Sequence, residues 1–440
     1  MNGSEGPMTG LGARFADGEA MHEWARDLFP ICRSLTGPGV RTTLDYLGDR
    51  LPGLRRHRIA TGVEVGDWVV PQEWEIRDAF IADMTGQRLV DFADNNLHVV
   101  GYSLPVDAVM GRAELDAHLH SLPDQPTAIP YVTSYYSPAW GFCLTQVQRD
   151  SLGDGPFRVW IDSELRDGHL DFADLVIPGR TTDEVLLSTY VCHPSMANNE
   201  LSGPVVLTAL GQWLASLPSR RYTYRLLFAP ETIGSISYLS RHLELLKSRV
   251  RAGWVLTCMG DDRAYSHVAS RLGTSLADRV SRRVLEDEFG PHRSYSFLER
   301  GSDERQWCAP GVDLPVCSVM RTKYGDFPEY HTSLDDLEFV TPTGLQGGFD
   351  VIRRCIEVLE ANVTWRTTTV GEPQMGRRGL YPNISRKDRA LDARKLMNVL
   401  AYCDGEHDVL DLCEVTGLPV GEVLASCETL AHANVVFADS

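Results

Sequence analysis

Between residues 183 and about 365, the sequence alternates between short apolar runs and longer segments with helical spacing. The run from Glu184 to Val191 is rich in apolar and β-branched residues, which is typical of a strand buried on both faces. We expect further strands at 222–228, 253–258 and 316–320, and helices at 204–217, 235–248, 276–288 and 343–362. This alternation predicts an α/β domain with a mainly parallel sheet and helices on both of its faces.

The segments on either side of this alternation have different patterns. Residues 18–60 show apolar residues at helical spacing, and residues 62–179 show short β-type runs separated by turn signals. These runs are 68–70, 97–102, 131–136 and 157–161, with one helix expected at 113–122. We therefore predict N-terminal helices of the main domain in 1–61, a β-rich insertion in 62–179 and the remainder of the main domain in 180–371.

The C-terminal segment 372–440 is predicted to be a separate module. A Gly/Pro-rich connector spans 371–384, and about three short helical segments follow before the apolar run 435–437. This is the pattern of a small winged helix. The segment is acidic, which favours packing between domains or subunits over binding to DNA.

Composition narrows the choice of partners and location. The net charge is −18, from 42 basic and 60 acidic residues, so no nucleic-acid partner is expected. The ten cysteines form no CxxC pair, which indicates reduced thiols. No secretory signal and no apolar run of about 20 residues is found, so we expect a cytoplasmic protein without a membrane partner. A small-molecule or short-peptide substrate is the expected partner, and homo-oligomerisation stays open.

Two candidate site segments each follow a predicted strand. The loop after the first strand contains His193, Asn199 and Glu200, and Gly203 then opens a helix. Ligands gather at the C-terminal ends of strands in such sheets, and zinc accepts histidine and carboxylate ligands. Glu231 follows the next strand, where a carboxylate suits a general base. Each segment also has a structural alternative, namely helix capping in the first loop and a carboxylate at a helix N-terminus for Glu231.

Two more segments complete the candidate set. Asp303, Glu304 and Arg305 lie in a Gly-Ser loop, where the carboxylates could bind an amine, Arg305 could bind a carboxylate, or all three could be solvated. Tyr330 and His331 lie between a strand and the last long helix, and His331 could equally be a core histidine.

The order of these segments resembles the zinc aminopeptidase superfamily of bacterial leucyl aminopeptidases and glutaminyl cyclases. The strings that carry the resemblance are Cys192-His-Pro-Ser, Ser202-Gly203, Pro230-Glu-Thr-Ile-Gly-Ser and Tyr330-His-Thr. More narrowly, nearly the whole chain is similar to bacterial proteins with an aminopeptidase-like domain and a C-terminal winged helix, through strings such as 28–37 and 378–382. The resemblance implies a three-layer zinc-peptidase-like domain with a mainly parallel mixed sheet. It also implies His193 and His331 as metal ligands and Glu231 as the base.

The chain departs from the two-zinc pattern at three ligand positions. Asn199 stands where the bridging aspartate is expected, and Thr232 and Thr257 replace two other carboxylates. A neutral amide does not offset the repulsion between two dications, so we expect one zinc ion. The expected ligands are His193, His331 and Glu200, with Asp303 or Glu304 as alternatives to Glu200.

These inferences predict a zinc-dependent amide hydrolase that acts on a small peptide or amino-acid conjugate, in a biosynthetic pathway. Glu231 would act as base and then acid, and Tyr330 would support the oxyanion. Substrate binding is expected from four residues: Asn199, Asp303, Glu304 and Arg305. Two alternatives stay open. One is a pseudoenzyme that binds a small amine or peptide, and the other is an assembly or regulatory protein that acts through the winged helix.

Overall fold

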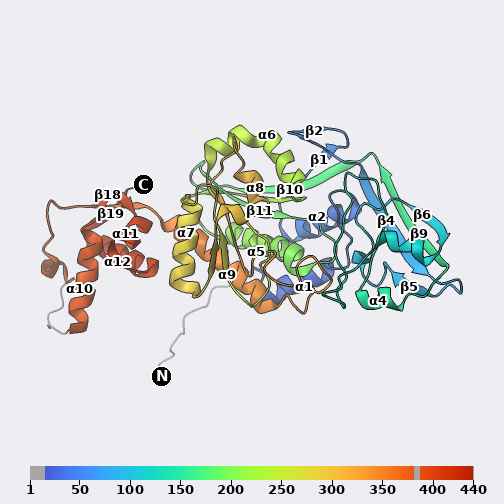
Figure 1. Ribbon diagram of the computed structural model, residues 1–440. Coiled ribbons are helices and arrows are strands. Elements are labelled where there is room, and N and C mark those ends of the chain that lie inside the picture. Colours follow the sequence, from blue (N-terminus) through green and yellow to red (C-terminus); the bar gives the residue numbers. More distant parts are fainter. Residues whose placement is uncertain (1–14, 381–386, 440) are drawn as a thin grey trace, which may run out of the picture.

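The computed structural model describes residues 15–380 and 387–439, and a large sheet lies at its centre (Figure 1). Its eight strands are β1 (Arg55–Ala60), β10 (His169–Ile177), β11 (Glu184–Tyr190), β12 (Thr223–Ala229), β13 (Val250–Val255), β14 (Ser266–Val268), β15 (Arg293–Tyr295) and β16 (Val316–Met320). Their order is β1-β10-β12-β11-β13-β16-β14-β15. β11 pairs in parallel with β12 and β13, and β13 with β16, whereas β10 and β14 join β12 and β16 in antiparallel pairs.

Helices cover both faces of this sheet (Figure 1). One face carries α1 (Gly18–Leu28), α2 (Pro38–Arg50), α5 (Ser202–Ser216), α7 (Leu276–Val284) and α9 (Pro342–Ala361), which pack against one another. The other face carries α6 (Ile233–Arg249) and the short α8 (Glu304–Trp307). Every residue of β11 and β12 is buried, as their apolar runs predict. The predicted three-layer α/β fold with a mainly parallel mixed sheet is therefore confirmed.

A smaller sheet lies at one end of the molecule (Figure 1). It contains β5 (Arg88–Asp91), β4 (Glu73–Ala82), β9 (Phe157–Arg166) and β6 (Val106–Met110), in that order. The short elements in this part of the chain are β2 (Glu64–Val65), β3 (Trp68–Val69), α3 (Arg112–Leu115), β7 (Leu119–His120), β8 (Phe142–Cys143) and α4 (Gln146–Ser151). The segment 62–179 is β-rich as expected, but its last strand, β10, belongs to the large sheet.

The C-terminal module lies at the opposite end (Figure 1). It contains a sheet of β18 (Asp404–Asp408), β17 (Thr364–Thr367) and β19 (Val436–Asp439), with helices α10 (Lys387–Leu400), α11 (Val409–Thr416) and α12 (Val420–His432). Arg279 of α7 donates hydrogen bonds of 3.0 Å to Asp408 and 2.7 Å to Asp411, which tie the module to the main domain. Residues 381–384 of the predicted connector lie outside the described residues.

Some sequence expectations differ from the structure. Residues 55–60, expected to continue the helical segment, form β1, because only Ile59 is buried and the segment pairs with the edge of β10. The run 131–136 forms no strand, and isolated bridges tie its surroundings to Gly101 and Thr332 instead. The helix expected at 113–122 is one short α-turn followed by a 3₁₀ turn that ends at His118. Among the described residues, no helix is both long and apolar enough to cross a bilayer.

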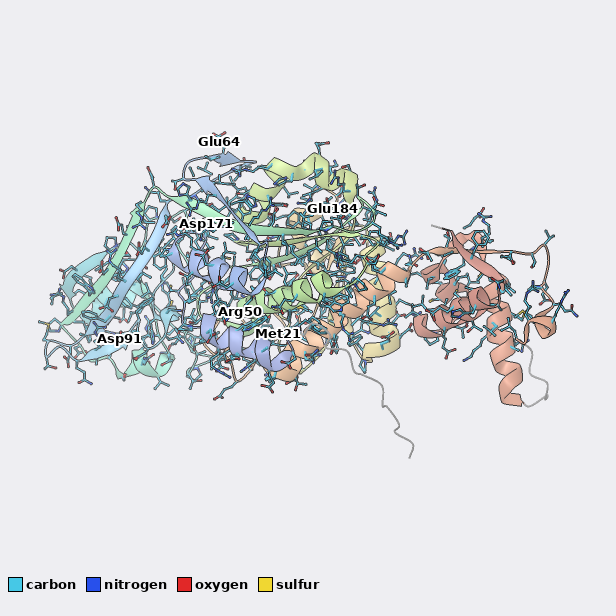
Figure 2. All side chains as sticks on the ribbon, turned by 180° about the vertical axis from the view of Figure 1, so that it is seen from behind. Met21, Arg50, Glu64, Asp91, Asp171 and Glu184 are labelled. Atoms are coloured by element: carbon cyan, nitrogen blue, oxygen red, sulfur yellow. The ribbon has the colours of Figure 1, made fainter. Side chains whose placement is uncertain are left out.

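The parallel strands define the edge at which a site can form. Glu184, labelled in Figure 2, opens β11 and is fully buried, and it is neutralised by Arg225 at 2.6 Å. The opposite edge is formed by the ends of β11, β12 and β13, and the loops that leave this edge begin at 191, 230 and 256. In open α/β sheets, ligands bind at this C-terminal edge.

Candidate active site

A cavity of about 330 Å³ opens at the C-terminal edge of the large sheet. His193 lines it from the loop after β11, and Glu231 lines it from the loop after β12. Arg305 reaches it from the short helix α8, and His331 from a loop later in the chain. The structure thus brings four of the sequence-predicted site residues to one cavity.

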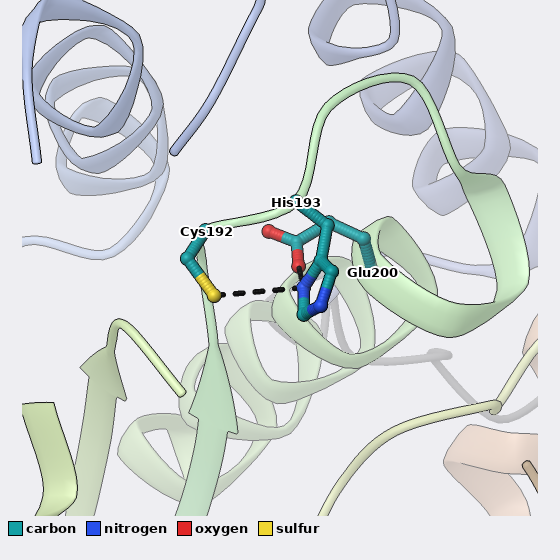
Figure 3. A group of neighbouring side chains, drawn as sticks. All are labelled: Cys192, His193 and Glu200. Carbon is teal, nitrogen blue, oxygen red and sulfur yellow. Dashed lines mark hydrogen bonds and ion pairs between the residues drawn. The ribbon is translucent and has the colours of Figure 1, made fainter. Parts of the chain in front are cut away.

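His193 is buried with its two ring nitrogens in different environments. Nδ1 lies 2.9 Å from Glu200 Oε2 and 3.5 Å from the Cys192 sulfur (Figure 3). Nε2 lies 3.8 Å from Glu231 Oε2. Burial, reinforced by the charge of Arg33, lowers the pKa of His193 to about 3, so the ring is neutral and free to act as a ligand. Since Glu200 holds Nδ1, Nε2 is the nitrogen left for a partner in the cavity.

Glu200 lies behind His193, on the π-helical turn Ala197–Leu201 that leads into α5. Burial raises the pKa of this carboxyl to about 8, although Arg33 opposes the shift from 3.5 Å. The Arg33 guanidinium donates to the backbone oxygens of His193 and Leu28, while Glu200 Oε1 accepts no hydrogen bond. Glu200 does not line the cavity, so its contact with Nδ1 is one that orients the ring.

His331 faces His193 across the cavity, with ring centroids 5.7 Å apart. Its backbone has φ of 58°, a strained region for a residue other than glycine, and its oxygen accepts a hydrogen bond of 2.9 Å from Tyr131 N. Burial and the neighbouring His193 lower its pKa to about 3. Tyr330 stacks on the His331 ring at 3.9 Å and does not line the cavity.

Glu231 stands between the histidines and Arg305. Its Oε2 faces His193, and its Oε1 lies 3.8 Å from an Arg305 nitrogen. Burial, with Asp303 nearby, raises the Glu231 pKa to about 8. The next residue, Thr232, has φ of 64°, so backbone strain is present on both sides of the cavity.

Three predicted site residues are held inside the protein by other groups. Asp303 accepts hydrogen bonds from Thr232 N and Ser235, and Glu304 accepts from Gly301 N and Ser302 N. Asn199 Oδ1 accepts from the Tyr190 hydroxyl at 2.9 Å. All three are fully buried, and none lines the cavity.

Two of the three positions that replace metal-binding carboxylates, Asn199 and Thr257, are joined by hydrogen bonds. The Tyr190 hydroxyl contacts both Asn199 Oδ1 and Thr257 Oγ1, the latter at 2.6 Å, and Thr257 Oγ1 also donates to the Asn199 backbone oxygen. Neutral groups therefore fill this part of the site. For one zinc ion, by contrast, the cavity offers His193 Nε2 and His331 as nitrogen ligands, with the Glu231 carboxylate beside them.

Aromatic residues that sequence reasoning missed form much of the cavity wall. Trp68, Tyr131, Tyr135 and Tyr136 line it, and the ring centroid of Tyr131 lies 5.3 Å from that of His193 and 5.2 Å from that of His331. The sequence signal for the three tyrosines is the run 131–136, whose pattern predicts a strand and so does not point to a cavity wall.

A second buried group of the same residue types lies elsewhere in the main domain. Donor atoms of His267, Asp278 and Cys317 lie within 4.8 Å of one another, as do those of Cys192, His193 and Glu200. None of the residues of the second group lines the cavity at His193.

Two family models together cover most of the chain. The model described as "Domain of unknown function (DUF4910)" matches residues 22–362, and a winged helix-turn-helix model matches residues 363–438. A curated relative from Clostridium acetobutylicum is 40% identical over 421 residues, which is 95% of this chain and 96% of the relative. Its name provisionally describes a polysaccharide biosynthesis protein with an aminopeptidase-like domain.

Solved structures show the same architecture. A crystal structure of a provisionally assigned peptidase from Clostridium acetobutylicum matches with a TM-score of 0.90 and 38% identity over 96% of both chains. A zinc aminopeptidase from Bacillus subtilis matches with a TM-score of 0.55 and 10% identity, over 77% of this chain and 94% of that one. The second likeness establishes the aminopeptidase-like fold. It therefore confirms, for the fold, the resemblance to the zinc aminopeptidase superfamily.

Proposed function

This chain belongs to the family defined by the DUF4910 domain. From its aminopeptidase-like fold and its cavity, we propose that it is a metal-dependent hydrolase of a small amide. The observation that supports this most directly is the convergence of His193 Nε2, His331 and Glu231 on one cavity, with 3.8 Å between the first nitrogen and the Glu231 carboxylate. The name of the curated relative from Clostridium acetobutylicum mentions polysaccharide biosynthesis. We therefore propose a biosynthetic conjugate or short peptide as substrate.

We propose that one zinc ion would be held by His193 and His331, with Glu231 beside it as the base. Zinc in such a site polarises a carbonyl and lowers the pKa of bound water. Glu200 fixes the His193 ring through Nδ1, and Arg33 fixes the loop that carries both. Tyr330 supports His331 by stacking. This arrangement revises our expectation for two residues, because Glu200 orients a ligand here and Tyr330 does not face the reacting atoms.

Glu231 is the group proposed to move the proton. It is the one carboxylate among the described residues that line the cavity. In amide hydrolysis it takes the proton from the attacking water and gives it to the nitrogen that leaves. The walls formed by Tyr131, Tyr135 and Trp68 limit the access of bulk water to this carboxylate.

The test is to compare wild type with Glu231→Gln on a panel of acylated amino acids, dipeptides and amino-acid amides. We expect turnover to fall by about 10²- to 10⁴-fold, with little change in ligand binding. Glu244→Gln, on the exposed face of α6, is the matched control and should keep full activity. Equal turnover by wild type and Glu231→Gln would overturn the proposal.

One observation favours a second candidate function, a binding protein without turnover. Asn199, Thr257 and Tyr190 form a closed hydrogen-bonded group where two-zinc relatives are expected to bind metal. In that case, wild type would bind ligands at the cavity, contain no zinc and hydrolyse no member of the panel.

A further inference from the structure

Arg305 places a positive charge in a cavity that, by its resemblance to aminopeptidases, would be expected to bind a positively charged amine. Among the described residues that line the cavity, Arg305 is the one lysine or arginine, and Glu231 is the one acid. Arg305 lies on α8, directly after Asp303 and Glu304, the two carboxylates that the sequence offers for binding an amine. The residue of this segment that reaches the cavity is therefore its cation.

The guanidinium of Arg305 is fixed in place but retains unused donors. Its Nη2 donates a hydrogen bond of 2.7 Å to Thr232 Oγ1, a neutral acceptor. The same nitrogen lies 3.8 Å from Glu231 Oε1, beyond hydrogen-bond length. Its Nε is buried and has no hydrogen-bond partner, although the side chain as a whole is 40% exposed. A guanidinium carries five N–H donors in a planar fork that matches a carboxylate.

The groups that would hold a substrate amine are turned away from the cavity. Asp303 is held by Thr232 N at 2.8 Å and Ser235 Oγ at 2.7 Å. Glu304 contacts the hydroxyls of Tyr324 and Ser318. Thr232 itself stands where two-zinc relatives are expected to have a carboxylate, and its hydroxyl accepts from Arg305 instead. Where an amine-binding site would present further carboxylates, this cavity therefore presents the Thr232 hydroxyl and the Arg305 guanidinium.

We propose that Arg305 anchors a carboxylate of the substrate, so that the site acts on amides with an acid group beside the scissile bond, such as N-acyl amino acids. This substrate class rests on the proposed hydrolase function. Hydrolysis of such an amide breaks the C–N bond. The hydroxyl of water goes to the acyl carbon and its proton to the nitrogen, which releases a carboxylic acid and an amino acid.

The geometry favours this order of groups along the substrate. Glu231 has one oxygen toward His193 and the other toward Arg305, each 3.8 Å from the nearest nitrogen. An amide bond beside Glu231 therefore has the histidines on one side and the guanidinium on the other. The α-carboxylate of an amino acid lies two bonds from the amide nitrogen, which suits this short spacing. Trp68 and Tyr136, whose rings meet edge to face at 5.9 Å, offer an aromatic surface at the same cavity for the side chain.

The test measures binding, which does not depend on turnover. Three probes are titrated calorimetrically into the full-length protein: N-acetyl-L-phenylalanine, its carboxamide and L-phenylalanine amide. We expect wild type to bind the acid about 10- to 100-fold more tightly than the carboxamide, since a hydrogen bond to a charged group is lost in the latter. Glu231→Gln, which retains Arg305, should show the same preference without hydrolysis.

Arg305→Met should abolish this preference, and Arg305→Lys should retain part of it, because a lysine keeps the charge but loses the fork. Arg300→Met removes an exposed arginine of the same segment that does not line the cavity, and it should leave all three affinities unchanged. Equal binding of acid and carboxamide, tighter binding of L-phenylalanine amide, or a preference that survives in Arg305→Met would overturn the anchor. If wild type hydrolyses none of the substrates but still binds the acid more tightly than the carboxamide, only the hydrolase function would be overturned.

Discussion

The main domain contains two buried groups of histidine, carboxylate and cysteine that have the same composition but different surroundings. His193 and Glu200 lie beside a cavity, and Glu200 Oε1 has no hydrogen-bond partner. Asp278, by contrast, accepts hydrogen bonds from His267, from Ser270 and from Ser275, at the N-terminus of α7. The two groups thus share their residue types, and they differ in access to the cavity and in the hydrogen-bond partners of each carboxylate.

The pKa values follow this difference. Burial raises the pKa of Glu200 to about 8, because it outweighs the opposing effects of the Arg33 charge and of the backbone of Cys192 and His193. Burial also acts to raise the pKa of Asp278, but the hydrogen bonds from His267, Ser270 and Ser275 outweigh it and hold this pKa well below its usual range. A carboxylate with saturated acceptors stabilises a fold, whereas one with an unused oxygen is typical of a functional site.

The largest expected contrast is in metal content. We expect wild type purified with zinc to hold about one ion per chain, His193→Gln to hold none, and His267→Gln to retain it, because a catalytic site needs an open position. Plasma mass spectrometry of the dialysed proteins measures this directly. Loss of zinc from His267→Gln with the fold intact by circular dichroism would show that the enclosed group is the metal site.

Stability should show the reverse contrast. Asp278→Ala is expected to lower the free energy of unfolding by about 3–5 kcal/mol, because it breaks the capping box that Asp278 forms with the N-cap Ser275 of α7 and leaves the donors of His267 and Ser270 without an acceptor. Urea denaturation followed by circular dichroism measures the change. A loss below about 1 kcal/mol would mean that the hydrogen bonds around Asp278 contribute little net stability.

The sequence predicted the fold and the meeting of His193 with Glu231, because both follow parallel strands that end at one edge of the sheet. It could not predict that Glu200 turns to Nδ1, since this depends on the π-helical turn at 197–201 and on Arg33, 167 positions before Glu200 in the chain. Nor could it predict that Asp303 and Glu304 are engaged by hydrogen bonds inside the protein. Carboxylates in such a sequence pattern are equally consistent with ligand binding. The boundaries of the domains stay a prediction.

Acid should remove the stabilising effect of Asp278. Its folded-state pKa lies below the unfolded value of about 3.9, so its contribution is complete above that pH and is lost as the pH falls through the folded-state value. The difference in unfolding free energy between wild type and Asp278→Asn should therefore stay constant from about pH 7 to about pH 5 and shrink below about pH 4. Urea titrations at several pH values test this. A difference that already disappears between pH 7 and 5 would contradict a lowered pKa.

Glu200→Gln should have the smallest effect on metal binding and stability, and it tests directly whether Glu200 differs in role from Asp278. Glutamine keeps an oxygen that can accept the Nδ1 proton of His193, but it cannot ionise to the carboxylate that makes the ring a stronger metal ligand. Loss of such a partner typically weakens metal affinity by about 10- to 100-fold, which chelator competition measures. The unfolding free energy at pH 7 should change by less than about 1 kcal/mol, because a carboxyl with a pKa of about 8 is mostly neutral there, like the glutamine that replaces it. A loss of stability as large as that of Asp278→Ala, with metal affinity unchanged, would make Glu200 a structural residue and the two groups equivalent.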